Sequence, residues 1–298
     1  MLTRERYGRT AWHVAAKWRS TKSFEKIRGW AKEVLTPVEL KNNLLLDEDN
    51  FGHTVLPAVV EWCSSHYAQK MLEWARDVLG TEELKNKVLL AKDNRKRSML
   101  HMAADCCNSG SMQTVWEWAE ALLTPKELKT QFLLAKDISN QTALHAAAAV
   151  GHSAEPLQKI WEWAKVVLTP EELKNQLLLA KDNRNRTPLQ VAADCQYTES
   201  LQTIWECAKV VLTREELKYQ LLLAKDISGQ TTLHSVVNSH RPLSVLNILE
   251  WTKDVLNTKE FNNILLLVKN RWGRSDWFSG RTGSDTRVSL ENIREWVR

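Results

Sequence analysis

Residues 137–148 read Asp-Ile-Ser-Asn-Gln-Thr-Ala-Leu-His-Ala-Ala-Ala, and variants of this stretch return along the 298-residue chain at a nearly constant spacing. The threonine or serine within it marks a period of 44 or 45 residues: Thr10, Thr54, Ser98, Thr142, Thr187, Thr231 and Ser275. Self-similarity at such a period is typical of repeat proteins, in which each repeat packs mainly on its neighbours. We therefore expect about six full repeats in residues 1–270 and a partial seventh repeat in residues 271–298.

The composition is that of a folded protein, with 43% hydrophobic and 26% charged residues. Ten glycines and seven prolines are few for this length and favour helices over strands. The net charge of +5 permits an acidic partner without requiring one. The N-terminal residues lack the apolar segment of a signal peptide, and no long uncharged apolar stretch could span a membrane. We expect a soluble cytoplasmic protein.

Each repeat opens with a turn and a short helix. The position two before the Thr or Ser anchor holds glycine four times and asparagine twice, which indicates a positive φ, and Lys96 is the exception. Thr187 is expected to cap a short helix with Pro188 in its first turn. Leu189, Ala192 and the following alanine then form one small apolar face.

A second helix follows, over about residues 199–212 in the fifth repeat. In the fourth repeat the apolar residues from Leu157 to Leu168 lie on one helical stripe. Trp163 falls at the edge of this stripe, where we expect it to pack sideways against the next helix. A core position is expected for the whole recurring set of tryptophans, which is Trp30, Trp74, Trp118, Trp163, Trp251 and Trp296, with Cys207 filling the one gap.

A third helix is indicated by Thr169-Pro170-Glu171-Glu172, in which threonine and the glutamate three residues later form a capping box. We expect this helix to run on toward Asp182 and to dock on the second helix. The same box recurs as Thr36/Glu39, Thr124/Glu127 and Thr213/Glu216, with the variant Asn257/Glu260. The repeat is thus a turn followed by three helices.

The turn and the first two helices resemble the ankyrin repeat, whose pattern is Asp-x-x-Gly-x-Thr-Pro-Leu-His-x-Ala-Ala. Residues 137–148 match it closely, and Gly151-His152 follows at the expected offset. The resemblance implies an all-α solenoid of ankyrin-like repeats, with a structural histidine hydrogen-bonded beside the threonine. Ankyrin repeats have about 33 residues, so the third helix is a surplus. The histidine is replaced by Pro57 and Gln190 in two repeats. A helical repeat of the armadillo or HEAT kind, with a period of about 40–47 residues, is the alternative.

The sequence shows no motif that is typical of a catalytic or metal-binding site. The four histidines of the pattern recur with the scaffold, whereas a catalytic residue is normally unique, and no phosphate loop, paired-carboxylate motif or nucleophile elbow is found. The five cysteines indicate free thiols. Cys106 and Cys107 near His101 lack the spacing of a zinc site. We expect a non-enzymatic protein without catalytic residues, cofactor, metal or small-molecule substrate.

Binding residues are sought where the repeats differ. Arginine and glutamine alternate before the anchor from the third repeat onward, and Arg95 and Arg184 lie in the arginine-containing turns. Duplication of a pair of repeats explains this alternation, and the other explanation is a basic row that binds a partner. The candidate residues of such a row are Arg97, Arg186, Arg274, Arg95 and Arg184. We expect Arg97, Arg186 and Arg274 to be exposed, because burial of an arginine without a partner is costly.

Alternate arginines would stand about 20 Å apart if helices pack about 10 Å apart. That spacing exceeds the Debye length of about 8 Å, so each arginine would act singly on a carboxylate or phosphate. Nucleic acid would require denser charge with exposed aromatic residues between. We therefore expect a protein-interaction scaffold for a partner with acidic patches, and no membrane. The alternative is a helical repeat scaffold that binds an anionic ligand or nucleic acid.

Overall fold

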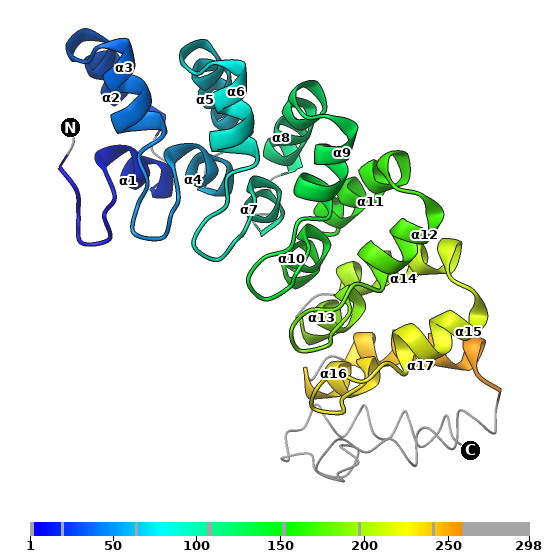
Figure 1. Ribbon diagram of the computed structural model, residues 1–298. Helices are drawn as coiled ribbons and strands as arrows, with labels where there is room; N and C mark the ends of the chain where they lie inside the picture. Colours follow the sequence, from blue (N-terminus) through cyan, green and yellow to red (C-terminus); the bar gives the residue numbers. More distant parts are fainter. Residues whose placement is uncertain are drawn as a thin grey trace. The chain divides into compact units, whose positions relative to one another are not determined.

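The computed structural model describes residues 3–18, 21–62, 65–105, 109–150, 153–195, 198–239 and 242–257. Every regular element in these ranges is a helix, which confirms the all-α repeat solenoid (Figure 1). The chain divides into two compact units, Met1–Ala147 and Ala148–Arg298, and each is a stack of three-helix repeats. The partial seventh repeat expected in residues 271–298 lies outside the described residues.

The first helix of each repeat is short because the small apolar stretch after the anchor is short. The six helices are α1 (Ala11–Lys17), α4 (Val55–Trp62), α7 (Met99–Asp105), α10 (Ala143–Ala149), α13 (Pro188–Asp194) and α16 (Thr232–Asn238). As expected, Thr187 caps α13, since its Oγ accepts the N–H of Gln190 at 3.4 Å. Successive first helices pack directly on one another, α1 on α4 and α4 on α7 in the first unit and α13 on α16 in the second. The fully buried Ala16 and Ala104 permit this close approach.

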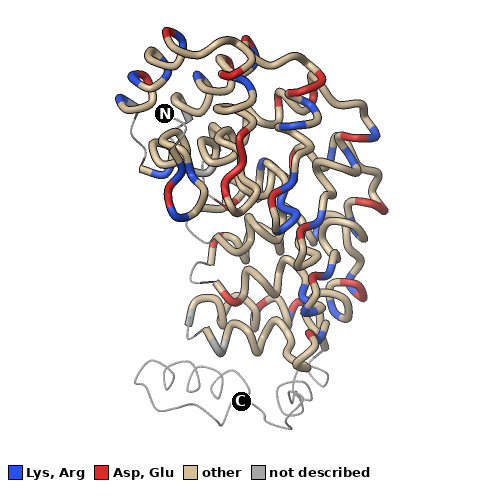
Figure 2. Tube along the Cα trace, turned by 60° about the vertical axis from the view of Figure 1, so that its left-hand side comes forward, with Lys and Arg blue, Asp and Glu red and all other residues tan. Residues whose placement is uncertain are grey.

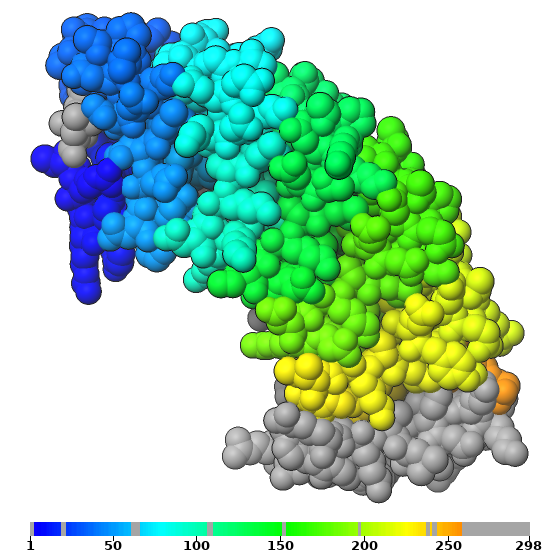
Figure 3. Space-filling view, in the orientation of Figure 1, coloured from blue at the N-terminus to red at the C-terminus, as the bar shows by residue number. Residues whose placement is uncertain are grey.

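The second helices are about twice as long, and within each unit they form a second row (Figure 1). They are α2 (Thr21–Val34), α5 (Ser65–Val78), α8 (Ser109–Leu122), α11 (Glu155–Val167), α14 (Thr198–Val211) and α17 (Pro242–Val255). In the first unit α8 turns its apolar face toward α7, the first helix of its own repeat, and in the second unit α14 does so toward α13. Second helices of neighbouring repeats also touch, α5 with α8 and α11 with α14. Within each unit the repeats therefore pack side by side (Figure 3).

The recurring tryptophan fills the interface with the preceding repeat in two cases. Trp74 is 4% exposed and stacks on Trp12 of the first repeat, with ring centroids 5.2 Å apart. Trp251 is 8% exposed and stacks on Trp205 of the fifth repeat at 4.8 Å. Burial at this position therefore depends on what the preceding repeat offers, because the indole faces that repeat.

The expectation of a core position is wrong for the other described members of the set. Trp30 is 55% exposed, and Trp118 and Trp163 are only half-buried. The buried indoles of α8 and α11 lie two residues earlier, at Trp116 and Trp161.

The third helices begin at the predicted capping boxes. The Glu127 N–H donates to Thr124 Oγ at 3.3 Å, and Glu127 Oε2 accepts the Thr124 N–H at 2.9 Å. The same reciprocal bonds are found at Thr36/Glu39, Thr169/Glu172 and Thr213/Glu216, whereas Glu260 of the expected variant lies outside the described residues. The α-helical part of each is brief: α3 (Pro37–Leu40), α6 (Thr81–Glu83), α9 (Pro125–Glu127), α12 (Pro170–Glu172) and α15 (Arg214–Glu216).

Each third helix then continues as a π-helix, which the sequence did not reveal. The segments are η1 (Lys41–Leu45), η2 (Leu84–Leu89), η3 (Leu128–Leu133), η4 (Leu173–Leu178) and η5 (Leu217–Leu222). They are closed by i→i+5 bonds such as Leu179 N–H to Lys174 O, 2.9 Å. The helix thus ends near Leu178, before the expected Asp182. The consecutive Leu177 and Leu178 are both fully buried, and η4 packs on α14, the second helix of the following repeat.

The capping-box glutamate also links neighbouring repeats. Lys85 lies 2.9 Å from Glu127 of the next repeat, and this lysine, together with the Thr124 cap, lowers the pKa of Glu127 to about 2. Lys41 pairs with Glu83, and Lys174 with Glu216, in the same way. Exposed ion pairs contribute little singly. They fix the register of adjacent third helices, while the buried leucines hold those helices in place.

Candidate partner-binding edge

A five-residue turn joins the third helix of one repeat to the first helix of the next. In the turn 93–97, Asp93 Oδ1 accepts the backbone N–H groups of Arg95 at 2.9 Å and Arg97 at 2.7 Å. The aspartates of the other turns accept the equivalent pairs of N–H groups, and they are Asp49, Asp137, Asp182 and Asp226. One carboxylate oxygen thus closes each turn.

The left-handed position in these turns confirms the prediction from the glycine and asparagine pattern. Gly8, Gly52 and Gly229 have φ values of 73°, 76° and 75°. Asn140 and Asn185 both have φ of 61°. Lys96, the exception in the pattern, adopts the same conformation with φ of 59°, which costs a residue with a Cβ some strain.

Neighbouring turns are bonded to one another at their tips. The Asn94 N–H donates to Phe51 O at 2.9 Å, and the Ile138 N–H donates to Arg95 O at 2.8 Å. In the second unit the Ile227 N–H donates to Arg184 O at 3.0 Å. We call these bonded turns the turn edge, which comprises residues 5–9, 49–53, 93–97 and 137–141 in the first unit and residues 182–186 and 226–230 in the second.

Two of the predicted binding residues are not free. Arg97 is 17% exposed and binds Asp93 at 2.8 Å and Asp105, at the end of α7, at 3.2 Å. Arg186 is 16% exposed and binds Asp182 at 2.8 Å and Asp194 at 2.9 Å. The expectation that these arginines are exposed is therefore wrong. Their carboxylate partners are supplied by the same repeat, so burial does not leave the guanidinium unpaired.

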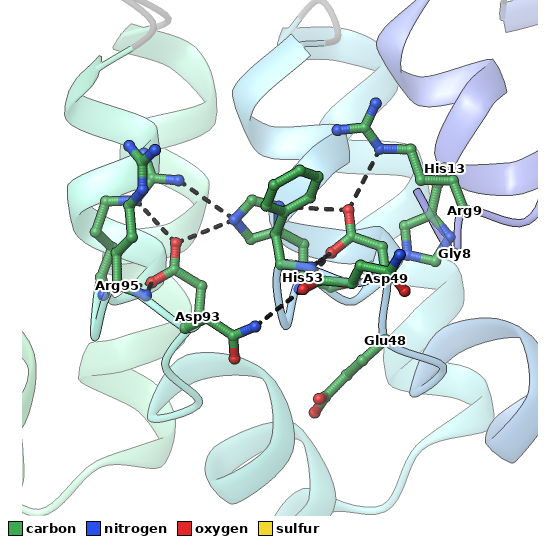
Figure 4. A network of polar contacts seen from close by, with 12 residues as sticks. Gly8, Arg9, His13, Glu48, Asp49, His53, Asp93 and Arg95 are labelled. Carbon is green, nitrogen blue, oxygen red and sulfur yellow. Dashed lines mark hydrogen bonds and ion pairs between the residues drawn. The ribbon is translucent and has the colours of Figure 1, made fainter. Parts of the chain in front are cut away.

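In the first unit the arginine belongs to a larger polar network (Figure 4). His53 lies between Asp49 and Asp93, and its Nε2 is 3.0 Å from Asp93 Oδ2. Arg9 reaches Asp49 at 3.3 Å, and Arg97 reaches His53 at 3.2 Å. Burial alone would raise the pKa of Asp93, but the hydrogen bonds from His53 and Arg97 outweigh it and lower that pKa to about 2. The network joins three consecutive turns and faces inward.

Two other predicted residues lie at the tips of the turns. Arg95 and Arg184 are exposed, and neither forms an ion pair within the described residues. Arg274 lies outside the described residues. Of the five candidates, the four that the structure describes therefore form two pairs: two exposed arginines at the tips and two arginines that hold the turn.

Apolar side chains at the tips were missed. Ile138 and Ile227 are 58% and 60% exposed, although branched aliphatic residues are usually buried. Tyr7 and Phe51 are 43% and 40% exposed and stack on each other with centroids 6.2 Å apart. Arg9 lies 5.5 Å above each of these two rings. The signal was present in the sequence, because all four occupy the one or two positions after the turn aspartate, or Glu5 in the first turn.

The recurring histidines are structural, as the ankyrin resemblance implied. His101 Nδ1 lies 2.7 Å from Ser98 Oγ, and its Nε2 lies 3.0 Å from the Gln141 carbonyl of the next turn. Burial lowers the pKa of His101 and of His13, so that the neutral ring is favoured. Gln190 takes the same place in the fifth repeat, with its Nε2 2.9 Å from Ala224 O.

In the repeat that has Pro57 in place of the histidine, the Thr54 hydroxyl is buried without a hydrogen-bond partner among the described residues.

The described residues offer no cluster of three or more His, Cys, Asp or Glu side chains able to hold a metal ion. Cys195 and Cys207 are free thiols, and burial raises their pKa values to about 11 and about 12, which keeps them protonated. Cys63, Cys106 and Cys107 lie outside the described residues. Among the helices that the structure describes, none has the length and apolar character needed to cross a bilayer.

Comparison with known proteins supports the fold. No family model matches the sequence, and no curated protein matches it. Among solved structures, the crystal structure of the ankyrin repeat domain of Bcl-3, described as a unique member of the IkappaB protein family, is similar with a TM-score of 0.52. The match has 15% sequence identity and covers 96% of this chain and 99% of that domain. The chain thus has an ankyrin-repeat-like fold, and the extra third helix distinguishes its repeats from those of about 33 residues.

Proposed function

We propose that this ankyrin-like chain is a non-enzymatic scaffold that binds another protein along its turn edge. The observation that carries the proposal is that the arginines within each arginine turn have different roles. The aspartates, Arg97 and Arg186 form the ion pairs that maintain the turn, whereas the side chains of Arg95 and Arg184 are exposed and form no ion pair within the described residues. Repeat arrays offer such extended surfaces to partners. Side chains that the fold does not use are the ones that a partner can select.

A protein with acidic patches fits this edge better than nucleic acid. Basic and acidic residues are interleaved along the described chain (Figure 2). In the sequence, a turn with isoleucine and serine separates the two turns that carry Arg95 and Arg184. A polyanion would be held by a dense row of cations with strong dependence on salt. The free thiols accord with a reducing compartment, and we expect the protein to act in the cytoplasm.

Photo-crosslinking in cell extract tests this proposal. A photoreactive amino acid would replace Arg95 or Arg184 on the edge, and Asp77 or Val210, which are exposed on the second helices, as controls. We expect crosslinks to one or a few proteins from the two edge positions and few from the controls. Crosslinks to nucleic acid, or equal yields from all four positions, would contradict the proposal.

A further inference from the structure

The turn edge alternates with a period of two repeats. Turns 93–97 and 182–186 display Asn-Arg at their tips, and turns 137–141 and 226–230 display Ile-Ser. The backbone is the same in all four turns, because each has the aspartate cap and a residue with positive φ. The alternation therefore leaves the backbone unchanged, and at the tips it replaces a cationic side chain by an aliphatic one.

The tip bonds place one residue of each kind side by side. In the first unit the Ile138 N–H bonds directly to Arg95 O at 2.8 Å, so an exposed arginine adjoins an isoleucine that is 58% exposed. In the second unit Ile227 adjoins Arg184 in the same way, with a bond of 3.0 Å and 60% exposure of the isoleucine. Each unit thus carries one Arg–Ile pair of identical composition.

The surrounding carboxylates leave the arginine of each pair available. The Oδ1 atoms of Asp93 and Asp182 are used by turn N–H groups, and their Oδ2 atoms are used by Arg97 and Arg186. No described carboxylate is within ion-pair distance of Arg95 or Arg184. The inner arginines therefore neutralise the turn aspartates, and the outer arginines keep their charge for a partner.

We propose that each Arg–Ile pair is a recognition site for a peptide segment in which an acidic residue lies within three positions of a large aliphatic or aromatic residue. The proposal rests on the proposed protein-binding function. The carboxylate of the segment binds the guanidinium, and its apolar side chain covers the isoleucine.

A polyanion fits the same site less well. Phosphate groups would use the arginine but would leave the isoleucine exposed to water, whereas the apolar side chain of a peptide would cover it and remove apolar surface from water. The two partner classes therefore differ in whether the isoleucine contributes to binding.

The chain supplies its own substitutions for the test. Ser139 and Ser228 occupy the arginine position in the other turns, so Arg95→Ser with Arg184→Ser removes the charge within an accepted turn sequence. Asn94 and Asn183 occupy the isoleucine position, so Ile138→Asn with Ile227→Asn removes the apolar group in the same way.

Matched controls lie on the second helices. Val166 and Val210 are 83% and 78% exposed, and Asp77 and Asp254 occupy the same position in other repeats. Val166→Asp with Val210→Asp therefore removes two exposed aliphatic side chains away from the turn edge. Circular dichroism of all variants should match that of the parent chain, since no substituted side chain is buried.

The probe is a random 12-residue peptide library displayed on phage and selected on the immobilised full chain. We expect the enriched peptides to carry Asp or Glu within three positions of Leu, Ile, Val, Met or Phe. In titrations with the synthesised peptides, each edge double variant should weaken binding roughly tenfold, which corresponds to about 1.4 kcal/mol. The valine control should bind like the parent.

Three results would overturn the inference. The first is enrichment of peptides that lack the acidic–apolar pair. The second is enrichment of peptides that bind both edge variants with the affinity of the parent chain. Both results leave the proposed scaffold function in place if the crosslinks to proteins persist. If the chain enriches no peptide but binds heparin or single-stranded DNA, with sensitivity to Arg95→Ser and none to Ile138→Asn, both the inference and the protein-binding function fail.

Discussion

The turn 93–97 and the turn 137–141 have one backbone and two different side-chain arrangements. In the arginine turn, Asp93 is buried and its Oδ2 is bound by His53 and Arg97. In the glutamine turn, Asp137 is half-buried and forms no ion pair within the described residues, yet its Oδ1 makes the same two bonds. The backbone bonds and the left-handed residue are therefore sufficient to form the turn. The buried ion pairs of the arginine turn are not required for this backbone conformation, and among the described residues they are absent where the sequence has glutamine.

The largest difference between the two turns should come from removing the aspartate. Asp93→Ala breaks the turn bonds and also leaves Arg97 and His53 without their shared carboxylate, so we expect a loss of about 3 kcal/mol or more. Asp137→Ala breaks only the turn bonds and should cost about 1–2 kcal/mol. Urea unfolding followed by tryptophan fluorescence measures both losses. Equal losses would show that the ion pairs add nothing to the arginine turn.

A smaller effect is expected when the arginine turn is converted into a glutamine turn. Glutamine is accepted at this position in Gln141, and sequence reasoning alone predicts a change within about 0.5 kcal/mol for an exposed site. The structure revises this prediction, because Arg97→Gln leaves the buried Asp93 Oδ2 with fewer donors and removes the partner of Asp105. We expect a loss of about 1–2 kcal/mol. The reverse change, Gln141→Arg, is the control and should be close to neutral.

The two turns also differ in the support that they receive from the preceding first helix. The Gln141 carbonyl accepts a hydrogen bond from His101 of the preceding repeat. The residue equivalent to His101 that would donate to the Arg97 carbonyl is Pro57, which has no such donor, and Thr54 Oγ has no hydrogen-bond partner among the described residues. Pro57→His should restore both contacts and raise the free energy of unfolding by about 1 kcal/mol. Thermal unfolding of the single variant measures the gain. Proline is tolerated in a first helical turn. A decrease in melting temperature would therefore show that Pro57 stabilises the fold more than the two hydrogen bonds of a histidine would.

The smallest effect is a dependence on pH that belongs to the glutamine turn. Burial lowers the folded-state pKa of His101 below 6.5, so the unfolded chain takes up the proton first as pH falls, and stability is lost below about pH 6.5. This histidine should cost up to about 0.8 kcal/mol at pH 6. His101→Gln, which copies Gln190, should reduce the slope of the profile between pH 7 and 5.5, where the remaining slope includes that of His13. The Asp93 carboxylate, whose pKa is about 2, does not titrate in that window. An unchanged slope in the His101→Gln variant would contradict the assignment of the pH dependence to His101.

The sequence by itself determined the repeat, the left-handed turn position and the capping boxes, because all three are local. A backbone that needs positive φ selects glycine or asparagine at one position, and a helix start needs threonine and glutamate three residues apart. The structural histidine was inferred from its motif with Thr142, and its bond to the next turn follows once the repeats stack. The fold class could be predicted for the same reason, since stacking is the way for such repeats to bury their apolar faces.

Only the tertiary structure decided which side chains are free. Arg97 and Arg95 are two residues apart in one turn and look equally available in the sequence, but Asp105 on α7 reaches Arg97 and no described carboxylate reaches Arg95. Likewise, Trp74 is buried against Trp12 of the neighbouring repeat, whereas Trp30 is exposed at the same repeat position. Charge pairing and packing across a stack depend on distances between residues far apart in the chain, and a local pattern does not contain those distances.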